Sequence, residues 1–290
     1  MSTSCIPLIT SLSPKGNHDI QRAAVASWLE LGLKVVSANT AGEITSLRQL
    51  YPDVTFHTVT RTAQAQAKKP VPLIDDLLAV HADSSEPFLF INADIILSPA
   101  PETLRAAIAS ARDGALICGG RLDVDDAIGA RAALQAGQHP TGDKVPGYDF
   151  FVVPPTLPMQ LPRTRLAIGM PFWDYWLPLA AHLSGAPLKE LAGDFALHSR
   201  HDAVWHGAIY PYFSIFLSAI LDQFSAAYGG GSLRERLAEQ MLRYEHAMLN
   251  ERVRAADSTD QEAATLSEFY DRQHDVLVYC MRAAMTPLEL

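Results

Sequence analysis

Short apolar runs alternate with amphipathic stretches along the first half of the chain. Residues 6–11 form an apolar run that predicts a strand, and a turn-rich segment leads from it into a helical pattern over about residues 19–31. Asn17 or Asp19 can cap that helix, Gly32 ends it, and residues 33–38 predict a second strand. Strand, helix and strand together take under about 40 residues, the length of a βαβ crossover.

The same alternation continues toward the middle of the chain. It predicts helices over about residues 43–51, 72–81 and 101–112, and strands over about residues 54–59, 88–97, 115–120 and 148–153. A polar stretch over residues 123–146 predicts a loop or short helix above the site. Such alternation is typical of a mostly parallel, Rossmann-like α/β sheet with helices on both faces, in which ligands bind at the carboxyl ends of the strands.

Helical patterns dominate the remaining sequence. One predicted helix carries Phe172-Trp173-Asp174-Tyr175-Trp176, and apolar residues recur at helical spacing over about residues 232–254, after the linker-like Gly229-Gly230-Gly231. We predict a single α/β domain over residues 1–228 and a helical C-terminal extension over residues 229–290 that packs on it. A partner-binding coiled coil is the alternative for the extension, although too few heptads are present.

The composition fits a folded, soluble chain. The 290 residues are 48% hydrophobic and 19% charged, which is ordinary for a protein with a sizeable core. The formal net charge of -9 argues against an extended nucleic-acid surface, because such a surface needs clustered Lys and Arg. A small anionic ligand still fits if a metal or basic residues such as Arg61 and Lys69 compensate for its charge locally.

Cysteine usage and hydropathy predict the compartment. Cys5, Cys118 and Cys280 are scattered and show no CxxC spacing, so neither a disulfide framework nor a zinc ribbon is supported, and we expect a reducing, cytoplasmic setting. The first residues do not resemble a signal peptide. The apolar residues 208–221 are too few to span a bilayer comfortably, so we predict a buried core helix and no transmembrane segment, with peripheral membrane contact as the alternative.

Asp94 interrupts the apolar run over residues 88–97, FLFINADIIL. A carboxylate in an apolar setting needs a cap, a partner or a metal. A capping or turn-forming Asp is one explanation, because Ser98 and Pro99 follow. The other depends on Asn92: in an extended strand its side chain points the same way as that of Asp94, and together they offer hard oxygen ligands for Mg²⁺ or Mn²⁺ shared with a diphosphate.

Three segments together resemble the nucleotide-sugar-dependent glycosyltransferases of the GT-A fold. They are residues 17–28 (NHDIQRAAVASW), the strand that ends in Asn92-Ala93-Asp94, and the later Trp173-Asp174-Tyr175-Trp176. The resemblance covers roughly residues 5–205. It implies an Asp-x-Asp element that binds a divalent metal (Mn²⁺ or Mg²⁺) and the donor diphosphate; Asn92 replaces the first Asp, brings no charge, and leaves metal dependence to be measured.

The resemblance also implies roles for residues at the strand ends. Thr10, Ser11 and Asn39 would line the nucleoside pocket, and Arg61 and Lys69 would meet the base or the phosphates. A surface or loop-capping role is the alternative for each of these residues.

Asp174 lies between two tryptophans, a combination that suits a sugar. Aromatic rings cover the apolar face of a pyranose, and the carboxylate takes a hydroxyl proton. In inverting GT-A enzymes a carboxylate at the start of a helix is this general base, and Asp174 resembles that position. The alternative is that Trp173 and Trp176 belong to the core of an amphipathic helix while Asp174 faces water.

A late histidine cluster and one more acid complete the candidates. The resemblance implies that His198 is a further metal ligand, and His201 follows three residues later; packing against Trp205 is the alternative for both. No Cys pair or HExxH motif accompanies them, so zinc is not the first choice. Asp149 begins a strand that would lie beside the donor sugar, or it is a turn residue.

These residues predict a glycosyltransferase that moves a sugar from a nucleotide diphosphate donor to a hydroxyl acceptor. A nucleotidyltransferase is one alternative, but residues 11–16 are only a faint version of its Gly-rich, basic loop. A catalytically inactive nucleotide- or sugar-binding module is the other. The sequence contains no Walker, GxGxxG or GxSxG motif, so kinase, dinucleotide oxidoreductase and serine hydrolase chemistry lack their usual support.

Overall fold

The computed structural model describes residues 6–201, 206–228, 247, 251–253 and 259–288. Its strands are β1 (Pro7–Thr10), β2 (Lys34–Asn39), β3 (Thr55–Thr58), β4 (Phe88–Ile91), β5 (Ile95–Leu97), β6 (Leu116–Val124), β7 (Asp143–Val153), β8 (Leu188–Leu191), β9 (Ala196–Ser199) and β10 (Met285–Pro287). Its helices are α1 (His18–Glu30), α2 (Ala41–Leu50), α3 (Gln64–Ala67), α4 (Ile74–Ala79), α5 (Pro101–Arg112), α6 (Ala127–Gln135), the 3-10 turn Leu157–Met159, α7 (Trp173–Leu183), α8 (His206–Tyr228) and α10 (Thr259–Ala284).

The described strands form one mixed, mostly parallel sheet in the order β10-β8-β6-β7-β4-β1-β2-β3. β1 pairs in parallel with β2 and β4, and β8 pairs in parallel with β6 and β10. β7 runs antiparallel to both of its neighbours, β4 and β6, while β9 joins β5 to β6. The predicted α/β fold with a mostly parallel sheet is confirmed.

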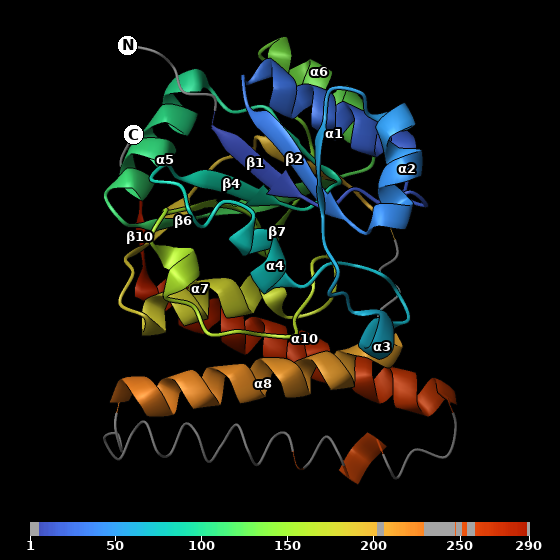
Figure 1. The fold of residues 1–290 in the computed structure, drawn as a ribbon, viewed down its shortest axis with the longest axis vertical. Coiled ribbons are helices and arrows are strands. Elements are labelled where there is room, and N and C mark those ends of the chain that lie inside the picture. Colours follow the sequence, from blue (N-terminus) through green and yellow to red (C-terminus); the bar gives the residue numbers. More distant parts are fainter. Residues whose placement is uncertain (1–5, 202–205, 229–246, 248–250, 254–258, 289–290) are drawn as a thin grey trace.

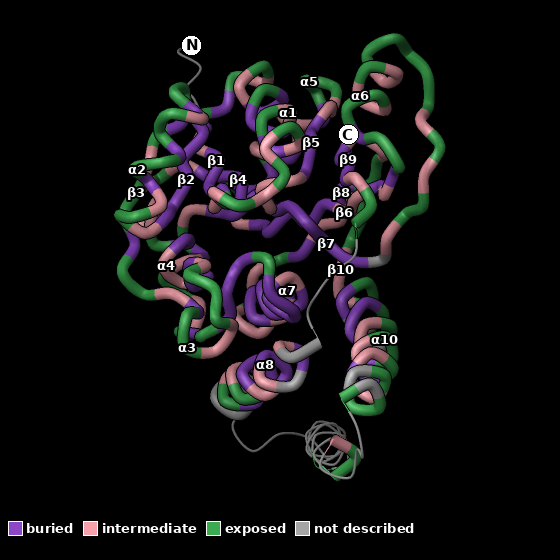
Figure 2. Tube along the Cα trace, turned by 90° about the vertical axis from the view of Figure 1, so that its right-hand side faces the viewer, coloured by how far each residue is buried: buried purple, intermediate pink, exposed green. Residues whose placement is uncertain are grey.

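Helices cover both faces of this sheet (Figure 1). α1, α2, α5 and α6 pack on one face, α4, α7 and α10 lie on the other, and α8 packs outside them against α7 and α10 (Figure 1). Side chains of β4 alternate between the two cores, because successive residues of a strand point to opposite faces. Phe88 and Phe90 enter the core under α7, whereas Leu89 and Ile91 enter the core under α1 and α5. Figure 2 shows the buried strands between the helical layers.

Local signals placed several elements correctly. The predicted helix over residues 101–112 is α5. Asn17 caps α1, because its side-chain oxygen accepts hydrogen bonds from the amides of Asp19 and Ile20, and Gly32 follows the helix with φ +75°. The prediction for residues 88–97 was wrong in one respect: the chain turns at residues 92–94 and makes two strands, β4 and β5.

The polar stretch over residues 123–146 was also predicted incompletely. It contains the end of β6, all of α6 and the start of β7 as well as loop residues. β6 extends past its apolar part because its polar end still pairs with β9 and with the start of β7. Pairing with neighbouring strands therefore determines its length, and hydropathy does not.

The C-terminal helices complete the second face. Residues 208–221 lie in α8 and bury Tyr212, Phe213 and Phe216 in the core, as expected. α10 packs against α7 and α8, and β10 adds an edge strand beside β8. The linker at residues 229–231, most of the helix expected over residues 232–254, and Trp205 lie outside the described residues. Among the helices that the structure describes, none has the length and apolar character to cross a membrane.

Candidate functional site

A cavity of about 1150 Å³ lies where β1 and β4 end. Its walls come from the segments that follow these two strands, from β6 and β7, from the start of α7, and from α10. The cavity therefore lies at the carboxyl ends of parallel strands, the position expected for a ligand site in an open α/β sheet. It exceeds the roughly 300–1,000 Å³ of common small-molecule sites.

Strand register brings Asp94 and His198 together. After β4 the chain turns at residues 92–94, so that β5 begins at Ile95. In the antiparallel β5–β9 pair Ile95 lies opposite His198, and in the parallel β6–β9 pair Asp123 lies opposite His198. His198 thus stands between an acid that precedes β5 and an acid on β6, although the three residues are far apart in sequence.

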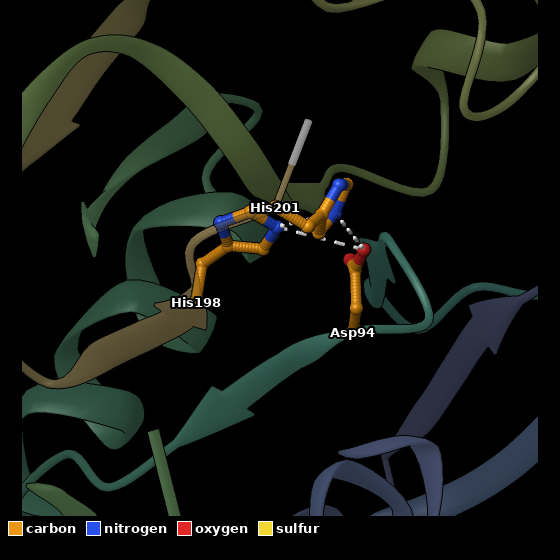
Figure 3. A group of neighbouring side chains, drawn as sticks. All are labelled: Asp94, His198 and His201. Carbon is orange, nitrogen blue, oxygen red and sulfur yellow. Dashed lines mark hydrogen bonds and ion pairs between the residues drawn. The ribbon is translucent and has the colours of Figure 1, made fainter. Parts of the chain in front are cut away.

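Asp94, His198 and His201 form a group of converging ligand atoms (Figure 3). The Oδ2 atom of Asp94 lies 3.6 Å from the Nε2 atom of each histidine, and the two Nε2 atoms are 3.2 Å apart. Ligands about 2.1 Å from a shared divalent cation are separated by about 3.0–3.5 Å in common geometries. The group therefore has the dimensions of a half-open cation site.

The surroundings of His198 favour the same interpretation. Its Nδ1 atom lies 2.9 Å from Oδ1 of Asp123, so the Nδ1 proton faces that carboxylate while Nε2 faces Asp94 and His201; a bound cation would replace the proton on Nε2. Such a carboxylate–histidine pair commonly orients metal ligands. Burial opposes a charge on His198, but hydrogen bonds to Asp123 and Asp94 outweigh it and raise the pKa of His198 to about 9. Burial likewise opposes ionisation of Asp94, yet bonds from His198 and His201 hold its pKa well below the usual range.

Arg121 extends this network along the cavity wall. Its Nε atom donates to Asp123 at 2.7 Å, and its Nη1 atom donates to Oδ1 of Asp149 at 2.7 Å. Asn92 donates from Nδ2 to the same Oδ1 atom at 3.1 Å. Residues 92–94 form a turn and not the extended segment that was expected, and within it Asn92 bonds to Asp149 while Asp94 faces the two histidines.

Asp174 lies in the first turn of α7 and lines the same cavity. Burial, together with the charge of Asp149, raises the pKa of Asp174 to about 7. Because of this pKa, the carboxyl group of Asp174 is divided between its protonated and ionised states at neutral pH, as proton transfer requires. Phe172, the residue immediately before α7, has φ +74°, a conformation that bulky residues rarely adopt.

The C-terminal helix contributes residues that the sequence analysis did not single out. Tyr270, Asp271 and His274 of α10 line the cavity, and the Tyr175 hydroxyl contacts Nδ1 of His274. Tyr270 and His274 are four positions apart and share a helical face. That spacing was visible in the sequence, but nothing in it indicated that this face meets the sheet edge.

The cavity includes some of the predicted residues and leaves others out. It is lined by Ser11, Lys69, Asn92, Asp94, Asp149, Trp173, Asp174 and His198. Four other predicted residues, Thr10, Asn39, Arg61 and Trp176, are not among the lining residues.

Each of these four residues has a contact or position in the fold that accounts for it. Thr10 donates to the carbonyl of Ile91 at 2.8 Å, and Asn39 donates to the carbonyl of Leu12 at 2.8 Å. Arg61 pairs with two acids at the start of α4. Trp176 is fully buried in the core.

The chain matches no protein-family model and no curated protein. Solved structures do resemble it. TarS 1-349 of S. aureus, solved in complex with UDP-GlcNAc, is 11% identical, with 97% of this chain and 88% of that chain covered and a TM-score of 0.50. The mannosyltransferase PcManGT of Pyrobaculum calidifontis, solved with GDP-Man and Mn²⁺, is 14% identical, with 96% and 85% covered and a TM-score of 0.43.

At such identities the likeness concerns the fold alone. The fold assignment depends on TarS, because the TM-score of the second match is lower. The order and mostly parallel pairing of the strands agree with that assignment. The chain therefore has a GT-A-like α/β fold.

Proposed function

We propose that the protein is a glycosyltransferase that moves a sugar from a nucleotide diphosphate donor to a hydroxyl group of an acceptor. One observation carries the proposal: Asp174, with a pKa of about 7, lines the same cavity as the Asp94–His198–His201 group. A proton acceptor and a cation site in one cavity are the two parts that an inverting, metal-dependent sugar transfer from a diphosphate uses. The cavity volume of about 1150 Å³ leaves room for two substrates.

The donor would bind along the segments that follow β1 and β4. Ser11, which follows β1, and Lys69, which follows α3, both line the cavity, and the Lys69 ammonium group would bind a phosphate or the base. Asp149 would lie beside the donor sugar, held in place by Arg121 and Asn92. Because the chain carries a formal charge of -9, the diphosphate also needs a cation close to it.

Asp94, His198 and His201 would hold that cation. Two imidazoles and a carboxylate suit Mn²⁺ better than Mg²⁺, which prefers oxygen ligands and retains its water. When bound, the cation offsets the negative charge that develops on the leaving diphosphate. Asp123 fixes the orientation of the His198 ring and so keeps Nε2 directed at the site.

Asp174 would accept the proton of the acceptor hydroxyl as the new glycosidic bond forms. Its place in the first turn of α7 keeps the side chain on a rigid element, as positioned proton transfer requires. Burial and the charge of Asp149 keep the pKa of Asp174 high, which makes the carboxylate a stronger base than an exposed Asp.

A panel of UDP-, GDP- and CMP-linked sugars, with and without Mn²⁺, tests the proposal. We expect at least one donor to raise the melting temperature with Mn²⁺ and to be hydrolysed slowly without an acceptor. A thermal shift without any turnover would identify a binding module instead. Release of pyrophosphate from a nucleoside triphosphate and a sugar phosphate would identify a nucleotidyltransferase.

A further inference from the structure

We propose that α10 supplies the surface that binds the acceptor, and that this surface fits an uncharged sugar. The assignment of this surface to the acceptor rests on the proposed function. A carbohydrate site along Tyr270 and His274 does not depend on that function. These residues lie in the C-terminal part of the chain, beyond the helix α7 that carries Asp174.

The tryptophans beside Asp174 are poorly placed to cover a sugar. Trp173 is 2% exposed and Trp176 is 0% exposed. The Trp173 ring packs edge-on against Phe90 and Phe151, with centroid distances of 5.2 Å and 5.7 Å. Both side chains are therefore occupied by the core, and the aromatic part of a sugar site must come from another element.

Tyr270 provides a ring that is only partly covered. It is half-buried, it lines the cavity, and its ring contacts that of Phe172 at a centroid distance of 5.4 Å. His274 lies four positions along the same helical face, with its ring 6.3 Å from that of Tyr270. An aromatic ring beside imidazole and carboxylate groups is a combination that binds sugars, because it pairs an apolar face with hydrogen-bonding groups.

α10 is also fixed to the helix that carries the candidate base. The Tyr175 hydroxyl contacts Nδ1 of His274, and Tyr175 is the residue next to Asp174 in α7. This contact joins α7 to α10 beside the cavity. A hydroxyl group that lies against Tyr270 and His274 would consequently be held on the side of the cavity where Asp174 lies.

The charges around Tyr270 favour an uncharged acceptor. Asp174 and Asp149 lie close enough to act electrostatically on the Tyr270 hydroxyl, and Asp271 follows Tyr270 in α10. The nearby guanidinium of Arg121 is held between Asp123 and Asp149. Burial lowers the pKa of His274, so its imidazole is neutral at pH 7. A phosphate or carboxylate on the acceptor would be repelled, whereas neutral hydroxyls would find acceptors for their protons.

Kinetics of the full chain test the proposal. Tyr270→Ala should raise the acceptor KM about tenfold, which corresponds to a loss of about 1.4 kcal/mol of binding free energy from the aromatic contact. The donor KM should change less than about twofold. Tyr279→Ala is the matched control, because Tyr279 lies on the same helix and is 76% exposed. His274→Gln, which keeps a hydrogen-bonding side chain, serves as a second variant if Tyr270→Ala does not fold.

The outcomes separate this proposal from the proposed function. If the wild type turns over a donor but neither variant changes the acceptor KM, or if phosphorylated acceptors are preferred, the α10 proposal is wrong. If the wild type turns over no donor, the proposed function fails. Binding to an array of neutral oligosaccharides then decides: loss of binding in Tyr270→Ala supports a carbohydrate site, and absent or unchanged binding overturns it.

Discussion

His198 donates from Nδ1 to the Asp123 carboxylate, 2.9 Å away. The bond crosses from β9 to β6, two strands that pair in parallel with these residues opposite each other. It turns the Nε2 atom of His198 toward Asp94 and His201. The sheet register itself therefore orients the candidate cation site.

Asp123→Asn should weaken Mn²⁺ binding about tenfold to hundredfold, because the His198 ring loses the carboxylate that orients it. Titration calorimetry with Mn²⁺ measures the change. Asp125→Asn is the matched control, since the Asp125 side chain is 89% exposed and pairs only with Arg200 among the contacts that the structure gives for it. Equal affinity for Mn²⁺ in the wild type and in Asp123→Asn would show that Asp123 does not orient His198 for metal binding.

Asp94→Ala should strongly weaken binding of Mn²⁺ and of the donor while the fold stays intact. The substitution removes the carboxylate from the group, and a site with two histidines alone should bind the metal at least about a hundredfold more weakly. Circular dichroism checks the fold, and thermal shift with donor and Mn²⁺ checks binding. Full donor turnover in this variant would exclude Asp94 as a metal ligand.

The activity should increase with pH up to about pH 7. Asp174 accepts a proton only when it is ionised, and its pKa is about 7, so the rate should fall roughly tenfold per unit below that pH. The pH profile of kcat measures this decrease, which is the acid limb of the profile. Asp174→Asn should lose at least about a hundredfold in kcat and should show no such limb. A wild-type profile that is flat from pH 5 to 8 would contradict the role of Asp174 as base.

Asp174 should also make the protein less stable as the pH rises. Its folded-state pKa of about 7 lies above the unfolded value of about 4, so the folded state binds more protons between these two pH values and loses stability across them. Asp174→Asn should therefore have a higher melting temperature than the wild type at pH 8, with a smaller difference at pH 4. Equal melting temperatures at pH 8 would contradict the raised pKa.

Local sequence patterns defined much of the fold. The alternation of apolar runs and helical periods predicted the parallel sheet, and Asn17 and Gly32 defined the limits of α1. The split of residues 88–97 into β4 and β5 was missed, because both halves are equally apolar. Only the pairing of β5 with β9, about 100 residues later, determines where the second strand begins.

The site was predicted less completely, for a related reason. Asp94 and His198 were recognisable because each stands beside an apolar run. Asp123 and Arg121 were not, since β6 pairs with β9 beyond its apolar part. Trp173 and Trp176 were attractive sugar-binding residues in the sequence, yet they lie one and two positions from Asp174, and such neighbours of a cavity-lining acid on a helix often face the core.

Arg121 should lower the pKa of Asp174, which burial and the charge of Asp149 raise. The guanidinium donates to Asp149 and Asp123; the charge of Asp149 raises the pKa of Asp174, and that of Arg121 lowers it. Arg121→Gln should therefore move the acid limb of the kcat profile to higher pH, and should lower the free energy of unfolding by about 1–3 kcal/mol because two carboxylates lose their partner.

Arg121→Lys separates charge from geometry. It keeps the positive charge but not the planar fork that reaches both acids, so its acid limb should lie between those of the wild type and Arg121→Gln. Arg112→Gln is the control, because Arg112 pairs with Glu86 at an exposed position and should change neither the limb nor, by more than about 0.5 kcal/mol, the stability. An acid limb at the wild-type pH in Arg121→Gln would show that the charge of Arg121 does not lower the pKa of Asp174.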